Sequence, residues 1–404
     1  MYTKAQGEFA DTARGREARE LIKSCVHCGF CLEACPTYRV LGDERDGPRG
    51  RIYLIKQMVE GGPAGAATQL HLDRCLTCRA CEPACPSGMQ YGRLLDIGRE
   101  ILEQRGTRPA SERAARRLLI RVVPDPRVFG PLLRLAHRLR SVLPRRWAQE
   151  IPVRTASGPW PAPRHARRMA VLDGCVQPAL APDINAAAAR VLDRIGISLV
   201  RVPGAGCCGA LAHHLGDTAR AFEAARRNVQ VCIGMLDDGC EAIISTASGC
   251  GVMVKDYGHL LRADSAHAEM ARRVAGATRD LCEVIDPDAV ARAQLRKSPH
   301  QAVAFQAPCT LQHGQGLTGR VEALLEAVGH TLVPVADPHL CCGSAGSYSI
   351  LQRGLAMELR TRKLAALLNG QPSVIATANI GCLAHLQATA PVSVRHWIEL
   401  IDAG

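Results

Sequence analysis

Short apolar runs alternate with helical stretches of mixed polarity through the C-terminal half of the chain. The apolar runs lie within residues 168–175, 197–209 and 241–251, and again within 302–309, 330–343 and 372–382. The stretches 184–196 and 319–329 place apolar residues at helical spacing and end at glycine. Alternating strands and helices are typical of parallel α/β units. We therefore expect two duplicated parallel α/β modules, at residues 169–298 and 299–404.

The N-terminal part has a helical pattern instead. Within residues 51–61, Ile52, Ile55, Met58 and Val59 recur at the spacing of one helix face. Residues 42–51 are rich in charge and glycine, so we expect a surface turn there. Residues 1–107 are expected to form a helical domain, and residues 108–168 to link it to the two modules. A chain of 404 residues is long enough for this number of domains.

Eight cysteines of the N-terminal domain form two motifs that each read C-x2-C-x2-C-x3-C-P. The first motif holds Cys25, Cys28, Cys31 and Cys35, and the second holds Cys75, Cys78, Cys81 and Cys85. This spacing is that of bacterial ferredoxins, which bind [4Fe–4S] clusters. The thiolates reach one cluster only if the backbone curls tightly, and Gly29 eases that curl. A pair of zinc sites is the alternative, which the two complete motifs with both prolines disfavour.

The two motifs are expected to exchange ligands. In two-cluster ferredoxins the fourth cysteine of each motif binds the other cluster. We therefore assign Cys25, Cys28, Cys31 and Cys85 to one cluster, and Cys75, Cys78, Cys81 and Cys35 to the other.

A second cysteine pattern repeats in the C-terminal half. Cys175, Cys207, Cys208 and Cys250 recur 132 to 134 residues later as Cys309, Cys341, Cys342 and Cys382. Each lies just past an expected strand, at the edge where open α/β sheets bind ligands. Adjacent thiols rarely form a disulfide but can reach two metal atoms. Nearby glycines let the backbone approach a cluster: Gly206, Gly209 and Gly343. We expect an iron–sulfur cluster in one copy or in both.

Two alternatives stay open for these modules, a zinc ion in one copy and an empty scaffold of thiols. Three cysteines have no counterpart in the other copy and are interpreted as structural: Cys232, Cys240 and Cys282.

The ordered set of motifs resembles a known family. The stretches "CVHCGFC", "GDERDGPRGRIYLIKQ", "HLDRCLTCR", "TASGCG", "HLCCGSAGSY" and "SVRHWIE" span residues 25 to 399. They are similar to the glycolate oxidase iron–sulfur subunits, within a wider group that serves flavin-dependent dehydrogenases and heterodisulfide reductases. Heterodisulfide reductase modules end in C-x-x-C, where this chain has Met253 and His385. We expect Met253 to pack in the core, and His385 stays open as a metal ligand.

The resemblance implies an electron-transfer subunit that passes electrons from flavin subunits, which oxidise glycolate to glyoxylate, toward a membrane quinone-type acceptor. It implies FAD on partner subunits only, and this chain shows neither a G-x-G-x-x-G motif after a strand nor a P-loop. No residue is assigned a catalytic role, and His213, His214 and His313 are interpreted as packing or loop residues. The alternatives are a heterodisulfide-reductase-like protein and the iron–sulfur subunit of a lactate or glycerol-3-phosphate dehydrogenase. A zinc-dependent binding protein with a basic patch is the alternative outside the oxidoreductases.

Charge and composition indicate where such a subunit works. Nineteen cysteines without a secretory signal indicate a reducing compartment, and no apolar run is long enough to span a membrane. An aromatic content of 3% argues against nucleic acid. Residues 108–168 hold 15 arginines and three acids. The net charge of this segment is therefore +12, which equals the formal net charge of the whole chain.

A basic amphipathic helix is expected within residues 131–144. Leu132, Leu135, Leu139 and Val142 share one face, and Arg134, Arg138 and Arg145 share the other. Such a helix binds an anionic membrane surface, docks on an acidic partner or packs on its own domain. We expect a cytoplasmic protein, peripheral on the inner membrane.

Overall fold

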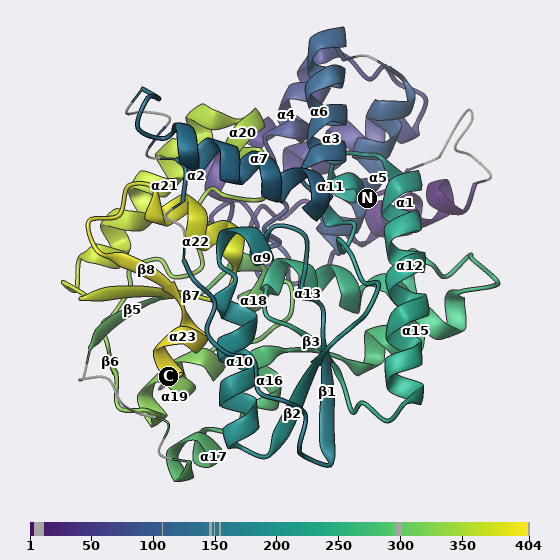
Figure 1. Cartoon of the computed structure of the whole chain (residues 1–404). Helices are drawn as coiled ribbons and strands as arrows, with labels where there is room; N and C mark the ends of the chain where they lie inside the picture. The colour runs from purple at the N-terminus through teal and green to yellow at the C-terminus, as the bar shows by residue number, and fades with distance from the viewer. Residues whose placement is uncertain are drawn as a thin grey trace.

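The computed structural model describes residues 1–3, 12–106, 108–144, 148, 150–152, 155–293, 295 and 301–402. It has a helical N-terminal domain, a helical arm and two α/β modules, which confirms the predicted fold class (Figure 1). The fold positions cysteines at two places, the loops of the N-terminal domain and the carboxyl edges of two sheets.

The N-terminal domain packs its helices around one apolar core. Its elements are α1 (Ala13–Ser24), α2 (Pro36–Leu41), the 3₁₀ helix η2 (Glu44–Asp46), α3 (Pro48–Val59), α4 (Ala66–Asp73) and α5 (Tyr91–Gln104). The predicted face of α3 is in this core, because Ile52, Ile55, Met58 and Val59 are all buried. Pro48 begins α3 at a position where a missing backbone N–H costs nothing.

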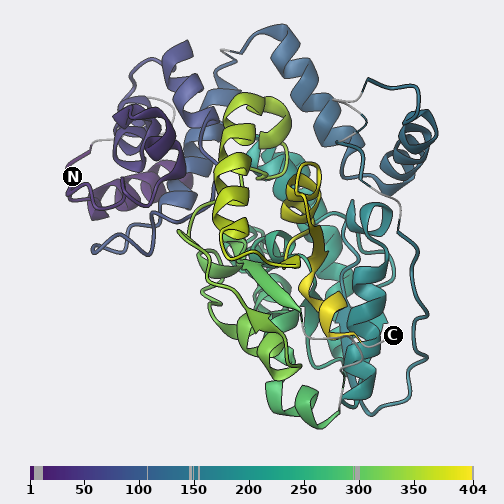
Figure 2. The ribbon, with the colours of Figure 1, turned by 90° about the vertical axis from the view of Figure 1, so that its left-hand side faces the viewer.

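An arm of two helices follows, α6 (Ala110–Val122) and α7 (Pro126–Leu139). Figure 2 shows these blue helices along the outer edge of the molecule. Arg116 of α6 pairs with Asp73 of the N-terminal domain at 2.9 Å, and Arg108 pairs with the same carboxylate. No residue of α7 is buried.

The first module is a four-stranded parallel sheet in the order β2-β1-β3-β4. Its strands are β1 (Arg167–Val171), β2 (Ile197–Arg201), β3 (Ile243–Ser245) and β4 (Thr278–Asp280). Its helices are α9 (Gln177–Leu180), α10 (Asp183–Arg194), α11 (Ala210–His214), α12 (Thr218–Asp237), α13 (Ser248–Lys255), α14 (Tyr257–Leu260), α15 (Ala268–Ala277), α16 (Leu281–Val284) and α17 (Pro287–Arg292).

The second module repeats this topology as β6-β5-β7-β8. Its strands are β5 (Ala302–Gln306), β6 (Thr331–Leu332), β7 (Val374–Thr377) and β8 (Ser393–His396). Its helices are α18 (Cys309–Gln312), α19 (Arg320–Ala327), α20 (Tyr348–Leu351), α21 (Arg353–Leu368), α22 (Ile380–Gln387) and α23 (Trp397–Ile401).

The sequence pattern found three strands in each module and missed the fourth, β4 and β8. These edge strands are short and polar, with burial only at alternate residues, so they lack the apolar run that marks the others. The two modules share a core in which α10 packs against α23 and Trp397 is fully buried. Both sheets are therefore held in one body.

Candidate iron–sulfur centre

The first three cysteines of the first motif line a cavity together with the last two cysteines of the second, Cys81 and Cys85. Cys25, Cys28 and Cys31 lie in the loop between α1 and α2, and Cys85 comes from the loop before α5. Burial raises the pKa of Cys31 to about 11, and the thiolates of Cys25 and Cys85 add to the rise. The fold thus brings Cys85 across to the first motif.

Four cysteines line a second cavity. These are Cys35, Cys75 and Cys78, together with Cys81, which borders both cavities. Burial raises the pKa of Cys81 well above its usual range, and the neighbouring thiolates of this group raise it further. The second group is the more enclosed one, because Cys35, Cys75 and Cys81 are buried whereas Cys28 of the first group is exposed.

Both cysteine loops have left-handed backbone at the same two positions. His27 and Gly29 have φ of 57° and 90°, and Thr77 and Arg79 have φ of 55° and 56°. Left-handed residues between right-handed ones turn several amide groups toward one point, which is an arrangement that binds anions. Gly29 adopts it at no steric cost, as predicted, whereas a side chain at Arg79 costs about 1 kcal/mol or more. The loops fit an anionic cluster.

The spacing of the sulfurs bears on whether they could hold a single zinc ion. Zinc binds thiolates at about 2.3 Å, so the sulfurs of a tetrahedral site lie about 3.8 Å apart. Among the residues that the structure describes, no three cysteine sulfurs all lie within 4.8 Å of one another. The described cysteines therefore do not stand in the arrangement of a closed tetrahedral zinc site.

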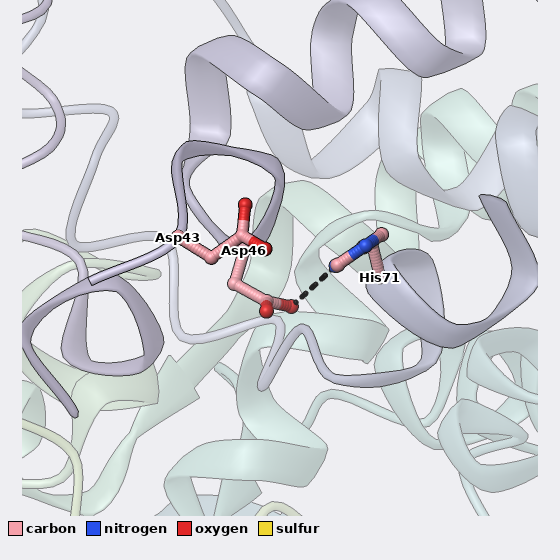
Figure 3. Close-up of side chains that lie close together, drawn as sticks. All are labelled: Asp43, Asp46 and His71. Carbon is pink, nitrogen blue, oxygen red and sulfur yellow. Dashed lines mark ion pairs between the residues drawn. The ribbon is translucent and has the colours of Figure 1, made fainter. Parts of the chain in front are cut away.

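A buried cluster of charges lies behind Cys35. The Asp46 carboxylate is inaccessible to solvent, and it pairs with His71 at 3.0 Å, with Arg74 at 3.0 Å and with Arg51 at 3.4 Å. Figure 3 shows Asp46 of η2 pointing at the His71 ring, with Asp43 to one side. Asp43, Asp46 and His71 are close enough to hold a cation, but two guanidinium groups already neutralise Asp46.

This cluster corrects part of the expectation of a surface turn at residues 42–51. Gly42, Glu44 and Arg45 are exposed as expected, but Asp46 and Arg51 are 0% and 1% exposed. The Arg51 guanidinium lies 3.9 Å from Cys35 Sγ and donates a hydrogen bond to Thr37 Oγ1 at 3.1 Å. A signal for Arg51 was present in the sequence, since it falls four residues before Ile55 on the buried face of α3.

Tyr91 is a further residue that the sequence analysis missed. Its hydroxyl donates to Cys75 Sγ at 3.6 Å, and its side chain is buried. Hydrogen bonds to cluster thiolates are one way in which a protein tunes a cluster's potential.

The first module brings its four repeat cysteines together at the carboxyl edge of the sheet. Cys175 follows β1, Cys207 and Cys208 follow β2, and Cys250 lies on α13 after β3. Hydrogen bonds from the thiols of Cys175 and Cys208 lower the pKa of Cys207. Cys208 also contacts Cys250, so the four thiols form one continuous group.

The second module has the same group in the same order. Cys309 contacts Cys341, Cys341 contacts Cys342, and Cys342 contacts Cys382. The amide of Gly343 donates to Cys341 Sγ at 3.4 Å, as the amide of Gly209 donates to Cys207 Sγ at 3.5 Å in the first module.

The glycines beside the double cysteines leave room for neighbouring parts of the protein. Gly209 and Gly343 have φ of 87° and 88°, and a Cβ on Gly343 would lie 2.5 Å from the carbonyl oxygen of Ala356 on α21. At Gly206 a Cβ would lie 2.4 Å from the Arg227 guanidinium. The absence of a side chain at these glycines thus makes room for a helix backbone at Gly343 and for the Arg227 side chain at Gly206.

One buried cation distinguishes the second module. Lys363 is 3% exposed, and its amine donates to the carbonyl oxygens of Asp337 and Pro338. Burial lowers its pKa, and the thiolates of Cys309 and Cys342 oppose that change. The residues 134 and 132 positions earlier are Val229 and Val231, so the first module has no lysine at this place.

The second module also touches the ferredoxin cysteines. The thiols of Cys78 and Cys309 lie within hydrogen-bonding distance, and Leu76 packs with Tyr348 and Leu359. The second ferredoxin group and the second module's group are therefore neighbours.

Other sequence expectations concern single residues. Met253 is buried in the core of the first module, as predicted. His385 Nε2 faces the carbonyl oxygen of Ala356 at 3.3 Å, and burial lowers its pKa to about 4. His313 Nε2 contacts the carbonyl oxygen of His339 at 3.0 Å.

The three cysteines without a counterpart are buried in the module cores, and these are Cys232, Cys240 and Cys282. Arg145 lies outside the described residues.

Comparison with known proteins covers nearly all of these sites. The family model of a 4Fe-4S dicluster domain matches residues 21–89, and that of a cysteine-rich domain matches residues 169–255 and 303–387. The glycolate oxidase iron–sulfur subunit of Escherichia coli is 48% identical over 403 residues, which cover 100% of this chain and 98% of that protein. A probable glycolate oxidase iron–sulfur subunit of Bacillus subtilis is 30% identical, over 95% of this chain and 91% of that one. Lactate utilization protein A of Bacillus licheniformis is 24% identical over 57% of this chain and 96% of its own length.

Proposed function

This chain belongs to the family of glycolate oxidase iron–sulfur subunits, and we propose that it is the electron-transfer subunit of a flavin-dependent complex that oxidises glycolate to glyoxylate. Flavin-carrying subunits take two electrons from the hydroxy acid, and this chain conducts them singly toward a quinone-type acceptor in the membrane. The observation that carries this proposal is the series of thiol groups that runs from exposed Cys28, through Cys81, which borders both cavities, to Cys78 and Cys309.

The ligand assignment is part of this proposal. Cys25, Cys28, Cys31 and Cys85 hold one [4Fe–4S] cluster, and Cys75, Cys78, Cys81 and Cys35 hold the other. When bound, such clusters supply one-electron redox chemistry. The two cavities and the left-handed loops support the assignment.

The module cysteines are proposed to hold one or two further iron–sulfur clusters. The ligands are Cys175, Cys207, Cys208 and Cys250 in the first module, and Cys309, Cys341, Cys342 and Cys382 in the second. The equal order of thiol contacts in both modules supports this proposal. Met253 is buried in the core where a fifth thiolate would stand, which speaks against heterodisulfide chemistry in the first module.

The ferredoxin assignment is tested on anaerobically purified protein. Cys28→Ala should lower the iron and acid-labile sulfide by about one cluster, because one thiolate ligand is lost. In the assembled complex it should abolish quinone reduction and leave flavin reduction by glycolate intact. Iron content equal to the wild type would refute the assignment. Turnover of glycolate against lactate by the same complex tests the substrate.

The module assignment needs a separate count. Cys342→Ser should lower iron further than the eight ferredoxin cysteines account for, because a hydroxyl is a poor ligand for iron. Cys282→Ser is the matched control, a buried cysteine outside the thiol groups. Equal iron content in the two variants and the wild type would show that the modules bind no iron and serve as scaffolds.

The arm is proposed to bind the anionic surface of the membrane. No described helix is long and apolar enough to cross a bilayer. Leu132, Leu135 and Leu139 of α7 are nevertheless 45% to 51% exposed, among arginines. Apolar side chains ringed by cations suit a surface of acidic lipids.

The complex should sediment with vesicles containing phosphatidylglycerol and not with phosphatidylcholine alone, and Leu135→Glu should reduce the bound fraction. Equal binding to both vesicles would refute this.

A further inference from the structure

The two ferredoxin motifs are an internal repeat, but the molecule covers only one of them. Residue by residue, Val26, Cys28 and Phe30 of the first motif correspond to Leu76, Cys78 and Ala80 of the second, each 50 positions later. Matching left-handed residues show that the two loops have the same backbone course. Differences in their exposure therefore reflect what packs against them.

The second loop is docked on the second module. Leu76 and Ala80 are 5% and 4% exposed, and Leu76 packs with Tyr348, Leu359 and the module's cysteines. Within this contact Cys78 reaches Cys309 of the module's thiol group. The loop thus places a proposed cluster ligand directly against the next group of thiols, and apolar side chains seal the contact.

The first loop presents the same positions to solvent. Val26 and Phe30 are 67% and 66% exposed, and Cys28 between them is exposed as well. Large apolar side chains exposed to water on both sides of a proposed cluster ligand are unfavourable in free energy. An exposed apolar group of this kind marks an interaction site. The loop itself is ordered by α1 and by Arg49, which donates to the carbonyl oxygen of His27 at 3.3 Å.

We propose that Val26 and Phe30 form the docking surface for the flavin-carrying partner subunit, at which electrons enter this chain. This inference rests on the proposed function and names its entry point. The occupant follows from the repeat, because Leu76, the counterpart of Val26, is covered by an apolar face that carries the next proposed redox ligands. Electron transfer slows steeply with distance, so the donor must dock close to an exposed ligand, and Cys28 is the exposed one of the eight.

The exit lies elsewhere on the molecule. In Figure 2 the purple N-terminal helices are on one side and the arm that carries α7 extends to the other. Entry at the first loop thus leaves the arm free to lie on a membrane while the partner is bound.

The experiment compares two double variants of the holo-protein, each mixed with the co-expressed and purified flavin subunits. Val26→Ser with Phe30→Ser should weaken the complex about tenfold or more, because central apolar anchors carry much of the binding energy of an interface. Leu118→Ser with Ile350→Ser is the matched control, since these residues are 62% and 59% exposed and lie outside the loop. The control should bind as the wild type does.

Two further readouts separate this inference from the proposed function. Iron, sulfide and the EPR signals of the reduced clusters should be unchanged in both double variants, whereas a wild-type protein without clusters would refute the proposed function alone. On partner binding, amide exchange should slow at residues 26–31 and stay constant at residues 76–81. Wild-type affinity of the Val26/Phe30 variant would overturn the docking surface. The proposal would also be overturned if the Val26/Phe30 variant bound the partner normally but no longer formed a dimer of the isolated chain. That result would assign the surface to a second copy of this chain.

Discussion

Charge at the residue scale distinguishes the two ferredoxin groups. Arg51 is completely buried and lies 3.9 Å from Cys35 Sγ, while Asp46 and Thr37 hold its guanidinium in place. A thiolate-bound cluster gains one negative charge when it is reduced, so a fixed cation beside it favours the reduced form. A cluster held by the proposed second group would thus be easier to reduce with Arg51 in place than without it.

Replacing this cation should therefore lower one potential only. Arg51→Met should shift the reduction potential of the second cluster downward by tens of millivolts, as an order of magnitude for one charge at this distance in a partly screened site. It should also destabilise the domain by about 3 kcal/mol, because Asp46 loses a buried partner. Redox titration followed by EPR measures both clusters at once, and Arg51→Lys should retain part of the potential. An unshifted second cluster would show that Arg51 acts on folding alone.

At the scale of elements, the sequence predicted what is periodic and missed what is buried by tertiary contact. The helix at α3 and the strands β1, β3, β5 and β7 follow from apolar runs, because their side chains fill the cores directly. The edge strands β4 and β8 carry no such run. The expected surface turn at residues 42–51 failed at Asp46 and Arg51 for a related reason. Charged residues are expected outside, and Asp46 is buried because two guanidinium groups neutralise it.

The candidate site divides in the same way. Cysteine spacing alone predicted the two ferredoxin groups and the two module groups, because ligand geometry fixes the spacing of cysteines within a loop. The contact of Cys78 with Cys309 joins segments 231 residues apart. Its formation depends on how the N-terminal domain docks on α20 and α21, which no local pattern encodes.

The loop after the second double cysteine gives a prediction at this scale. Gly343→Ala should displace Cys341 and Cys342, because the new Cβ would meet the Ala356 carbonyl oxygen of α21 at 2.5 Å. Gly346→Ala is the matched control, a glycine with φ of 63° and nothing within 4 Å of an added Cβ. Both substitutions cost about 1 kcal/mol in backbone strain, but only the first should lower the iron content while every thiol remains. Equal iron in the two variants would mean that α21 yields to the added methyl group.

For the whole molecule, the N-terminal domain docks on both modules. Its contact with the second module combines apolar side chains and thiols with an ion pair between Arg39 and Asp337, whereas its contact with the first contains a buried ionic group. There Asp96 of α5 lies between His213 and His214 of α11, at 3.3 Å and 3.1 Å. The side chains of Asp96 and His213 are 9% and 12% exposed, and that of His214 is 35% exposed. Burial alone would raise the pKa of Asp96, but the two histidines hold it well below its usual range.

This ionic contact should make the docking of the N-terminal domain sensitive to pH. Burial lowers the pKa of His213, and Asp96 raises it by more, so that it ends above the usual value near 6.5; Arg14 opposes the rise and Asp256 supports it. A raised histidine pKa contributes stability that is complete below about 6.5 and is lost as the pH rises through the folded-state value. His214 has a lowered pKa, because burial outweighs the attraction of Asp96, and it acts in the opposite sense.

Asp96→Asn should therefore destabilise the protein most at low pH. The amide keeps the shape and removes the charge, and we expect a loss of about 1–3 kcal/mol at pH 6, because a buried charged hydrogen bond is broken. The loss should be smaller at pH 9, where His213 of the wild type has given up its proton. Thermal unfolding of the anaerobic holo-protein at both pH values measures the difference, with Asp217→Asn as the control, a carboxylate that caps α12 at the surface. A loss that is equal at pH 6 and pH 9 would show that His213 carries no proton in the folded protein.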